Sequence, residues 1–480
     1  MKEEPVKTKK ELMEIETGVN SKKGVKHIKE EKKFYIGNFN GLVDLVRNDE
    51  RIKFLTYKEG LLDYITIDEK EFEPPEQLPW LSPRYSEVIK EYKKHTVASD
   101  SSDGTKGGCL YCNTKLYPEL LEYFKQFSET PTEFHYHYLV WTTFHSYLIE
   151  KFNFSPILFL VATKDRGKTP TLKALAYIAR RGIFTETFRE PNIIRWSSDY
   201  EASLFFDVRN FPLKVEKSGS EDLIFGRAER GSISSRVIYP ERGAFKDMVN
   251  FSVFGLTGAT SNIMVDSITE ARCIVVRMPF SKKVFNIEPT REIGLPYKEK
   301  LTAFRMAHFD TPFIYLEKEK IGKLENYLRG YHQMIKTLFP IYEKEFVKFR
   351  NMIRNQKKDE AESTLEGKLI KSVISLQDNV EQGINFLATE DIANEINKER
   401  VERFWYGIDK IGSELSSLGF KMIRNSLRTK RGIEYDPILV ESLADQYGVD
   451  HERHTSDKPS EESEESKDMP EIAKDIFGNQ

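Results

Sequence analysis

Short apolar runs separated by polar turns divide the middle of the chain into alternating strands and helices. The most continuous run, Ile157 to Val161, has the length and composition of a strand buried on both faces. Residues 171–180 follow with apolar side chains at helical spacing, and residues 181–280 continue as short strands and helices in alternation. This order predicts an α/β core with a mainly parallel sheet.

The flanking segments follow other patterns. Residues 34–81 carry short β-type runs between Gly and Asp turns, which predict a small β-rich module. Residues 116–127 and 134–152 place aromatic and aliphatic side chains at helical spacing, and a buried helix face explains this stripe without a cofactor. Residues 301–371 are helical in pattern and strongly charged, and another compact unit starts near Phe386.

The turn after the run at 157–161 resembles a phosphate-binding loop. Its triplet Gly167-Lys168-Thr169 lies between the predicted strand and helix, although Ala162 replaces the first glycine of the GxxxxGK[ST] pattern. Such a loop exposes backbone amides to phosphate, while its lysine reaches the β/γ-phosphates and its hydroxyl ligates Mg²⁺. The alternative is an ordinary turn whose lysine is solvated. The predicted ATP-binding residues are Thr163, Lys164, Asp165, Arg166, Gly167, Lys168 and Thr169.

A phosphate loop also needs a carboxylate that holds Mg²⁺. The interrupted apolar run from Phe211 to Glu216 is predicted to be a strand that ends in this acid, which makes Glu216 the candidate catalytic residue and metal ligand. Val215 stands where a second acid would strengthen the motif, so hydrolysis is less secure than binding. Asp207 is the reserve candidate, and an exposed strand-end glutamate is the other interpretation of Glu216.

Two further segments supply candidates for sensing the γ-phosphate. A third predicted strand, residues 251–262, ends in small polar residues, of which Thr257, Thr260 and Asn262 can position water. Arg272 precedes a fourth apolar run and can act as an arginine finger on a neighbouring subunit. A polar turn and a surface ion pair are the respective alternatives.

The order of these pieces resembles the helicase-like P-loop ATPases of plasmids, viruses and integrated elements, in the AAA+ and superfamily 3 style. The similar segment extends from Tyr117 to Met278, about a third of the chain, and departs from the family pattern at Ala162 and Val215. The resemblance implies ATP and Mg²⁺ as cofactors and a homo-oligomer, in the family a hexameric ring, that moves on DNA. It also implies that Arg230 or Arg236 faces a DNA strand in the pore.

The C-terminal part has the outline of a winged helix. Two predicted helices, residues 389–397 and 406–418, precede two short strands around a long turn. Residues 421–432 contain no acid, and their basic side chains are the predicted DNA contacts. These side chains are Lys421, Arg424, Arg428, Lys430 and Arg431. A basic turn on a protein-binding winged helix remains the alternative.

Charge and cysteine content limit the remaining possibilities. The chain has 480 residues, 39% hydrophobic and 31% charged, which is typical of a globular protein. No apolar run approaches a membrane span and the N-terminus lacks an apolar signal region, so we expect no membrane partner and a cytoplasmic location. Cys109 and Cys112 form one CxxC. A zinc ion would need two more ligands, with His95, His135 and His137 as candidates, and a loop with free thiols is the alternative.

The expected organisation follows from these patterns. Charged disordered tails occupy 1–33 and 451–480, the β-rich module 34–97 and a loop 98–115. The P-loop ATPase core with its helical lead-in occupies 116–290, a charged helical region 291–380 and the winged-helix-like domain 381–450. The leading hypothesis is a helicase-like ATPase for DNA replication or remodelling in a mobile element. The alternatives are a DNA-binding initiator or regulator whose degenerate ATPase core serves oligomerisation, and a nucleotide-gated signalling protein without a DNA partner.

Overall fold

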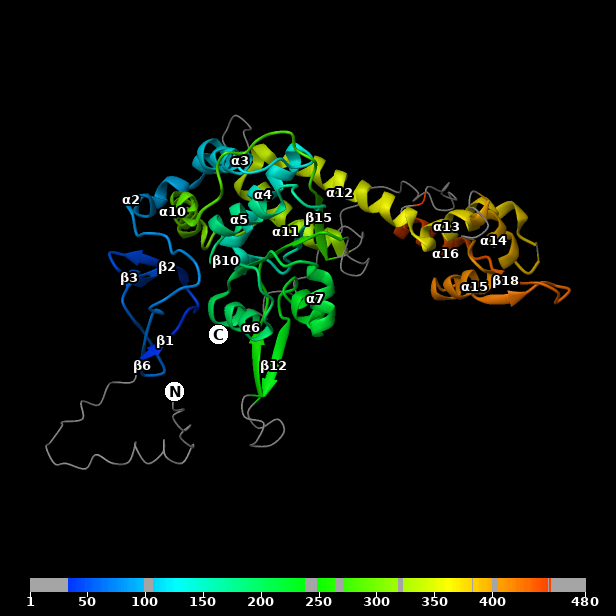
Figure 1. Ribbon diagram of the computed structural model, residues 1–480, viewed down its shortest axis with the longest axis horizontal. Helices are drawn as coiled ribbons and strands as arrows, with labels where there is room; N and C mark the ends of the chain where they lie inside the picture. Colours follow the sequence, from blue (N-terminus) through cyan, green and yellow to red (C-terminus); the bar gives the residue numbers. More distant parts are fainter. Residues whose placement is uncertain are drawn as a thin grey trace, which may run out of the picture. The chain divides into compact units, whose positions relative to one another are not determined.

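The chain forms two compact units, whose elements are labelled in Figure 1. The computed structural model describes residues 33–98, 107–237, 248–263, 272–317, 323–381, 383–398, 405–447 and 449. The first unit lies within residues 1–131, 139–269 and 275–313, and the second within 132–138, 270–274 and 314–480. The tails expected at 1–33 and 451–480 lie outside the described residues, apart from residue 33.

Two small three-stranded sheets begin the first unit. One has the order β1 (Phe34–Tyr35), β6 (Lys70–Glu73), β5 (Ile65–Ile67), and the other β2 (Leu42–Asn48), β3 (Arg51–Thr56), β4 (Gly60–Leu62). One face of the second sheet is apolar, and its Val43, Val46 and Leu55 form a core cluster with Ile89 and Met306. This packing anchors the N-terminal strands to the nearby helix at Ile89 and to a helix much further along the chain at Met306.

Buried charges also join the N-terminal sheet to the rest of the unit. Asp44 of β2 and Arg181 lie 3.0 Å apart, with 2% and 0% of their side chains exposed. Arg305 donates hydrogen bonds to the carbonyls of Val43 and Leu42 and pairs with Glu150. Because buried charges are tolerated only when paired and hydrogen-bonded, these contacts fix one arrangement of the strands.

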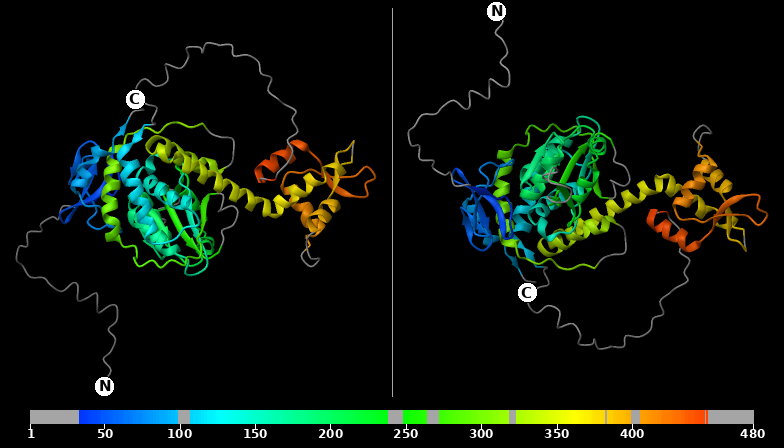
Figure 2. Two further views of the ribbon diagram at one scale, coloured as in Figure 1. Left: turned by 90° about the horizontal axis from the view of Figure 1, so that it is seen from above. Right: turned by 90° about the horizontal axis from the view of Figure 1, so that it is seen from below.

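Helices precede and follow the central sheet. Before it lie α2 (Glu87–Lys90), η1 (Tyr92–His95), β7 (Val97–Ala98), β8 (Gly108–Cys109), the π-helix η2 (Cys112–Leu116), α3 (Tyr117–Lys125), α4 (Glu133–Tyr147) and η3 (Ile149–Lys151). The aromatic stripe is buried as expected, including Tyr138, Trp141 and Phe144. After the sheet, α10 (Arg291–His308) packs against α2, α5 and η1, and Figure 2 shows it beside the N-terminal strands.

The central sheet has five strands in the order β10, β11, β14, β9, β15. Their bounds are β9 Ile157–Val161, β10 Gly182–Thr185, β11 Ser203–Phe206, β14 Thr257–Ser261 and β15 Cys273–Arg277. The pairings of β10 with β11, β11 with β14 and β14 with β9 are parallel. The predicted strand at 157–161 is confirmed and fully buried, and α5 (Lys168–Ile178) packs on this sheet.

Two predictions within the core are wrong. Residues 211–216 belong to the helix α7 (Phe211–Ser218), which begins with Phe211 and Val215 buried on one face and Pro212 in its first turn. Residues 251–262 form two strands, since β13 (Met248–Ser252) pairs antiparallel with β12 (Ile233–Val237), and β14 starts afresh at Thr257. The helices α6 (Glu190–Tyr200) and α8 (Glu221–Gly226) complete this part.

The second unit is mostly helical. It contains α11 (Lys323–Leu338), η5 (Pro340–Tyr342), α12 (Glu343–Ser363), α13 (Leu365–Ser375), η6 (Gln377–Asn379), β16 (Phe386–Ala388), α14 (Thr389–Asn397), α15 (Ile408–Ser417), β17 (Met422–Arg424), β18 (Arg431–Glu434) and α16 (Pro437–Tyr447). The helices α13 to α16 share one apolar core with the antiparallel sheet β16-β18-β17, drawn in yellow to red in Figure 2. Among the described residues of the chain, no helix is both long and apolar enough to cross a bilayer.

Candidate nucleotide site

A tight turn connects β9 to α5 and is held open by left-handed backbone. Asp165 has φ 58° and Gly167 has φ 73°. Gly167 suits this position because it carries no Cβ, and a Cβ placed there would lie 3.2 Å from the Cβ of Ser128. Left-handed residues within such a turn direct neighbouring amides toward a common point, which makes the turn suited to an anion.

The two signature residues begin helix α5. The Lys168 ammonium donates to the carbonyl oxygens of Ala162 (2.8 Å) and Thr163 (2.6 Å), so its side chain spans the turn. Burial lowers the pKa of Lys168, and the nearby carboxylates of Asp207 and Asp165 oppose that effect. A lysine placed here brings positive charge into the turn, next to the orphan amides of the first helical turn.

Asp207 follows β11 and accepts two hydrogen bonds, one from the first turn of helix α5 and one from the end of strand β14. Its Oδ2 accepts from Thr169 Oγ1 at 2.7 Å, and its Oδ1 accepts from Thr260 Oγ1 at 2.5 Å. The three residues meet because β9, β14 and β11 are parallel neighbours, so their carboxyl ends share one edge of the sheet. A carboxylate and two hydroxyls at one point are oxygen ligands of the kind that Mg²⁺ prefers.

Glu216 does not take part in this cluster. It is exposed on helix α7, and Val215 beside it is buried. The run 211–216 has a strand-like composition, but its buried residues Phe211 and Val215 have helical spacing, and the segment forms a helix. The signal for Asp207 was its position directly after the apolar run Leu204-Phe205-Phe206.

A pocket of about 620 Å³ lies at this edge of the sheet. Basic and acidic side chains both line it, together with Asn262, the predicted sensor. The lining residues are Lys164, Asp165, Lys168, Thr169, Asp207, Val208, Arg209, Asn210, Thr260, Ser261 and Asn262. Four of the predicted loop residues, Lys164, Asp165, Lys168 and Thr169, therefore line one cavity with the polar tip of β14, whereas Thr163, Arg166 and Gly167 are not among its lining residues.

Some predicted residues lie in other surroundings. The Arg166 guanidinium lies over the ring of Phe280, 5.2 Å from its centroid. Thr257 is buried and accepts a hydrogen bond from Arg227 at 2.8 Å. Arg227, which the sequence did not single out, is fully buried, and burial lowers its pKa to about 9. Its guanidinium also donates to backbone carbonyls, including those of Ala202 and Leu256, so it stabilises the strand starts.

The predicted pore arginines have protein partners in the structure. The Arg230 guanidinium donates to the carbonyls of Phe152 and Ile149, at 2.7 and 2.8 Å. Arg236 of β12 is exposed and forms an ion pair with Glu190. Arg272, the predicted finger, is half-buried directly before β15. The carbonyl contacts indicate that Arg230 serves the local fold.

The basic hairpin of the second unit is less strongly charged than its sequence suggests. Lys421 pairs with Glu434 at 2.8 Å, and Lys430 pairs with Glu390 at 3.4 Å. Arg424, Arg428 and Arg431 are exposed, and Arg424 donates to the carbonyl of Arg428. The absence of acids within residues 421–432 does not leave the two lysines unpaired, because their acidic partners come from outside that segment.

Comparison with known proteins adds weak likenesses to solved structures. No family model and no curated protein matches the chain. The apo NrS-1 C-terminal region is 9% identical, with a TM-score of 0.35, over 78% of this chain and 83% of that one. The SCCmec type IV Cch active helicase is 12% identical, with a TM-score of 0.31, over 84% and 81%. Because these scores are low, the likenesses carry no argument about function.

Proposed function

We propose that this protein binds ATP with Mg²⁺ at the pocket between the turn 162–167 and the tip of β14. The observation that carries the proposal is the contact of Asp207 with both Thr169 and Thr260, beside Lys168 at the start of α5. In this arrangement Lys168 would hold the β/γ-phosphates, and Thr169 with Asp207 would hold the metal. Bound Mg²⁺ supplies neutralisation of phosphate charge.

Hydrolysis requires a group that orients the attacking water. Asn262 and Thr260 line the pocket on the side of β14 and are suited to that role. In a ring of identical subunits, Arg272 would act as the finger that completes a neighbour's site. Val208 follows Asp207, where a second acid would supply a strong base.

We further propose a helicase-like ATPase that acts in DNA replication or remodelling, as in mobile elements. The order of the sheet supports this class, because β14 lies between the phosphate-loop strand β9 and the acidic strand β11, as in AAA+ ATPases. In the second unit, α13, β16, α14, α15 and the β17–β18 hairpin have the order of a winged helix.

The winged helix is proposed to contact DNA mainly through its hairpin. Helix α15, in the position of a recognition helix, exposes Asp409, Lys410 and the uncharged Ser413. The charges of Asp409 and Lys410 cancel. Arg424, Arg428 and Arg431 on the hairpin are therefore the main source of positive charge for phosphate contacts.

A specific observation favours a second candidate function. The residues described around the pocket include two carboxylates, Asp165 and Asp207, and Asp207 is engaged by both threonines. A site with no separate base can bind nucleotide and release phosphate slowly. Such a protein would be a DNA-binding initiator or regulator that uses the nucleotide to hold an oligomer together.

Nucleotide binding and phosphate release, measured with and without DNA, test these proposals. Lys168→Ala should abolish binding or release, whereas Lys173→Ala should change neither, because Lys173 lies on the same helix against Phe184 and outside the pocket. DNA-stimulated release that Lys168→Ala removes supports the motor. Binding without release supports the oligomerisation platform, and no binding of ATP or ADP by the wild type at millimolar concentration refutes both.

A further inference from the structure

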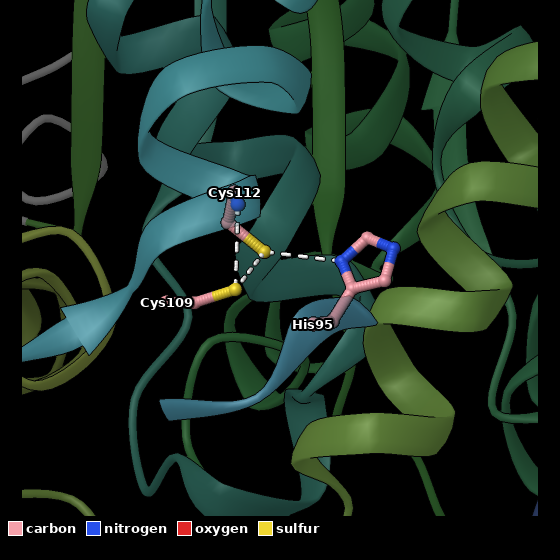
Figure 3. Close-up of side chains that lie close together, drawn as sticks. All are labelled: His95, Cys109 and Cys112. Atoms are coloured by element: carbon pink, nitrogen blue, oxygen red, sulfur yellow. Dashed lines mark hydrogen bonds between the residues drawn. The ribbon is translucent and has the colours of Figure 1, made fainter. Parts of the chain in front are cut away.

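A cluster of sulfur and imidazole side chains lies in the first unit, away from the residues that line the nucleotide pocket. Cys109 and Cys112, from β8 and the start of the π-helix η2, direct their sulfurs toward each other, 2.8 Å apart (Figure 3). The His95 ring, at the end of η1, places Nδ1 3.1 Å from the Cys112 sulfur. The ligand atoms of these three residues all lie within 4.8 Å of one another.

A fourth potential ligand comes from a distant part of the sequence. His308, at the end of α10, places Nε2 3.9 Å from the Cys112 sulfur. Two sulfurs and two imidazole nitrogens form one of the common tetrahedral donor sets for zinc. His135 and His137, the other histidines considered from the sequence, lie elsewhere, against Thr132 and Tyr342.

The spacing of the donor atoms suits a metal after small side-chain adjustments. Zn–S bonds of about 2.3 Å and Zn–N bonds of about 2.0 Å give a tetrahedron with edges of about 3.8 Å between sulfurs, about 3.5 Å between sulfur and nitrogen and about 3.3 Å between nitrogens. The distances of 2.8, 3.1 and 3.9 Å lie within 1 Å of those edges. Rotation of the cysteine side chains opens the short edges. The 4.8 Å set contains His95, Cys109 and Cys112, so the His308 ring must also move toward the other donors to complete the tetrahedron.

Surrounding contacts orient the cluster. Asn113 donates to the Cys109 carbonyl at 2.7 Å, and His308 Nδ1 lies 3.5 Å from the Thr311 hydroxyl, on the ring edge opposite Nε2. The rings of Tyr111 and Phe304 pack against His95. Outer contacts of this kind fix the orientation of metal ligands. The π-helix that begins at Cys112 is itself a conformation concentrated at functional positions.

We propose that His95, Cys109, Cys112 and His308 bind one structural zinc ion. All four side chains are buried, with 3% or less of each residue exposed. Four protein ligands leave no open position for water or substrate, which distinguishes a structural site from a catalytic one. The ion would join η1, the β8–η2 segment and the end of α10. It would thereby attach the start of the helical lead-in to helix α10, and α10 packs against the phosphate-loop helix α5.

Metal analysis of the full-length protein tests this proposal directly. Protein purified without chelators should contain about one zinc per chain, and exchange with Co²⁺ should give the visible bands of tetrahedral cobalt with thiolate charge transfer. Cys112→Ser and His308→Gln should each lose most of the zinc. Cys273→Ser, which changes the third buried cysteine of the chain, should keep it.

Two results on the wild type would overturn the proposal, and both can be obtained even if a variant fails to fold. Folded wild-type protein with less than about a tenth of an equivalent of zinc, even after incubation with Zn²⁺, excludes the site. A Cys109–Cys112 disulfide found by peptide mapping of the wild type under non-reducing conditions also excludes it. These measurements report metal content and cysteine oxidation and do not involve nucleotide. The zinc proposal and the ATP-binding proposal can therefore fail independently.

Discussion

Removal of the Asp44 carboxylate, which pairs with the buried Arg181, should strongly destabilise the first unit. Asp44→Asn keeps the shape of the side chain but removes its charge. The buried Arg181 then keeps its hydrogen bonds to the Asn38 side chain and the Tyr200 carbonyl, both of which are uncharged. Burial and the neighbouring Arg180 lower the pKa of Arg181 to about 10, so it remains charged at neutral pH. The variant therefore contains a buried cation without its carboxylate.

Breaking a buried pair by removing one partner costs about 3 to 5 kcal/mol of unfolding free energy. Asparagine retains an oxygen that can accept from Arg181, so we expect the lower end, about 3 kcal/mol. For a unit of this size the melting temperature should fall by roughly 6 to 12 °C. The matched control is Asp63→Asn, which removes the exposed carboxylate that pairs with the half-buried Lys53 (3.0 Å) and should cost less than about 1 kcal/mol.

The pH dependence provides a second check in the same thermal melts. Burial alone would raise the pKa of Asp44, but Arg181, Arg180 and hydrogen bonds outweigh it and hold the pKa below its ordinary value. A lowered carboxyl pKa stabilises the fold above the pKa of the unfolded chain, about 4, and this stabilisation is lost as the pH falls further. The melting temperature of the wild type should therefore exceed that of Asp44→Asn by a constant margin from pH 5 to 8. Below pH 4 the difference should become smaller. Equal melting temperatures for Asp44→Asn and Asp63→Asn at pH 7 would refute the reasoning.

Three further predictions concern the proposed sites. Asp207→Asn should weaken Mg²⁺-dependent ATP binding, while Glu216→Gln should leave it unchanged, and titration with and without Mg²⁺ decides between the two acids. Pro170 lies in the first turn of α5 without an N–H, so Pro170→Ala should add a donor and tighten ATP binding by roughly 2- to 10-fold; weaker binding would contradict this. Charge reversal by Arg428→Glu and Arg431→Glu should lower DNA affinity and reduce its salt dependence by about two ions. The control Lys58→Glu, in an exposed loop, should change neither. Unchanged affinity in the double variant would favour a signalling protein.

The local sequence pattern was enough to predict those elements that have a characteristic apolar run or spacing. The strand at 157–161 is apolar at every position, and Gly167-Lys168-Thr169 follows it at the spacing that a strand, turn and helix require. The helices predicted at 389–397 and 406–418 lie close to the observed bounds of α14 and α15, because amphipathic spacing and a glycine at 419 define them, whereas α16 was not expected.

Tertiary structure decided which distant residues meet. Asp207 reaches Thr169 and Thr260 only because β11, β14 and β9 are neighbours in the sheet, and no spacing along the chain encodes that order. His308 lies 196 residues beyond Cys112, so the complete Cys₂His₂ cluster follows from the packing of α10. Lys421 and Lys430 likewise gain acidic partners from other elements. Periodicity reports which face of an element is buried, whereas the partner across that face is set by the packing of the whole chain.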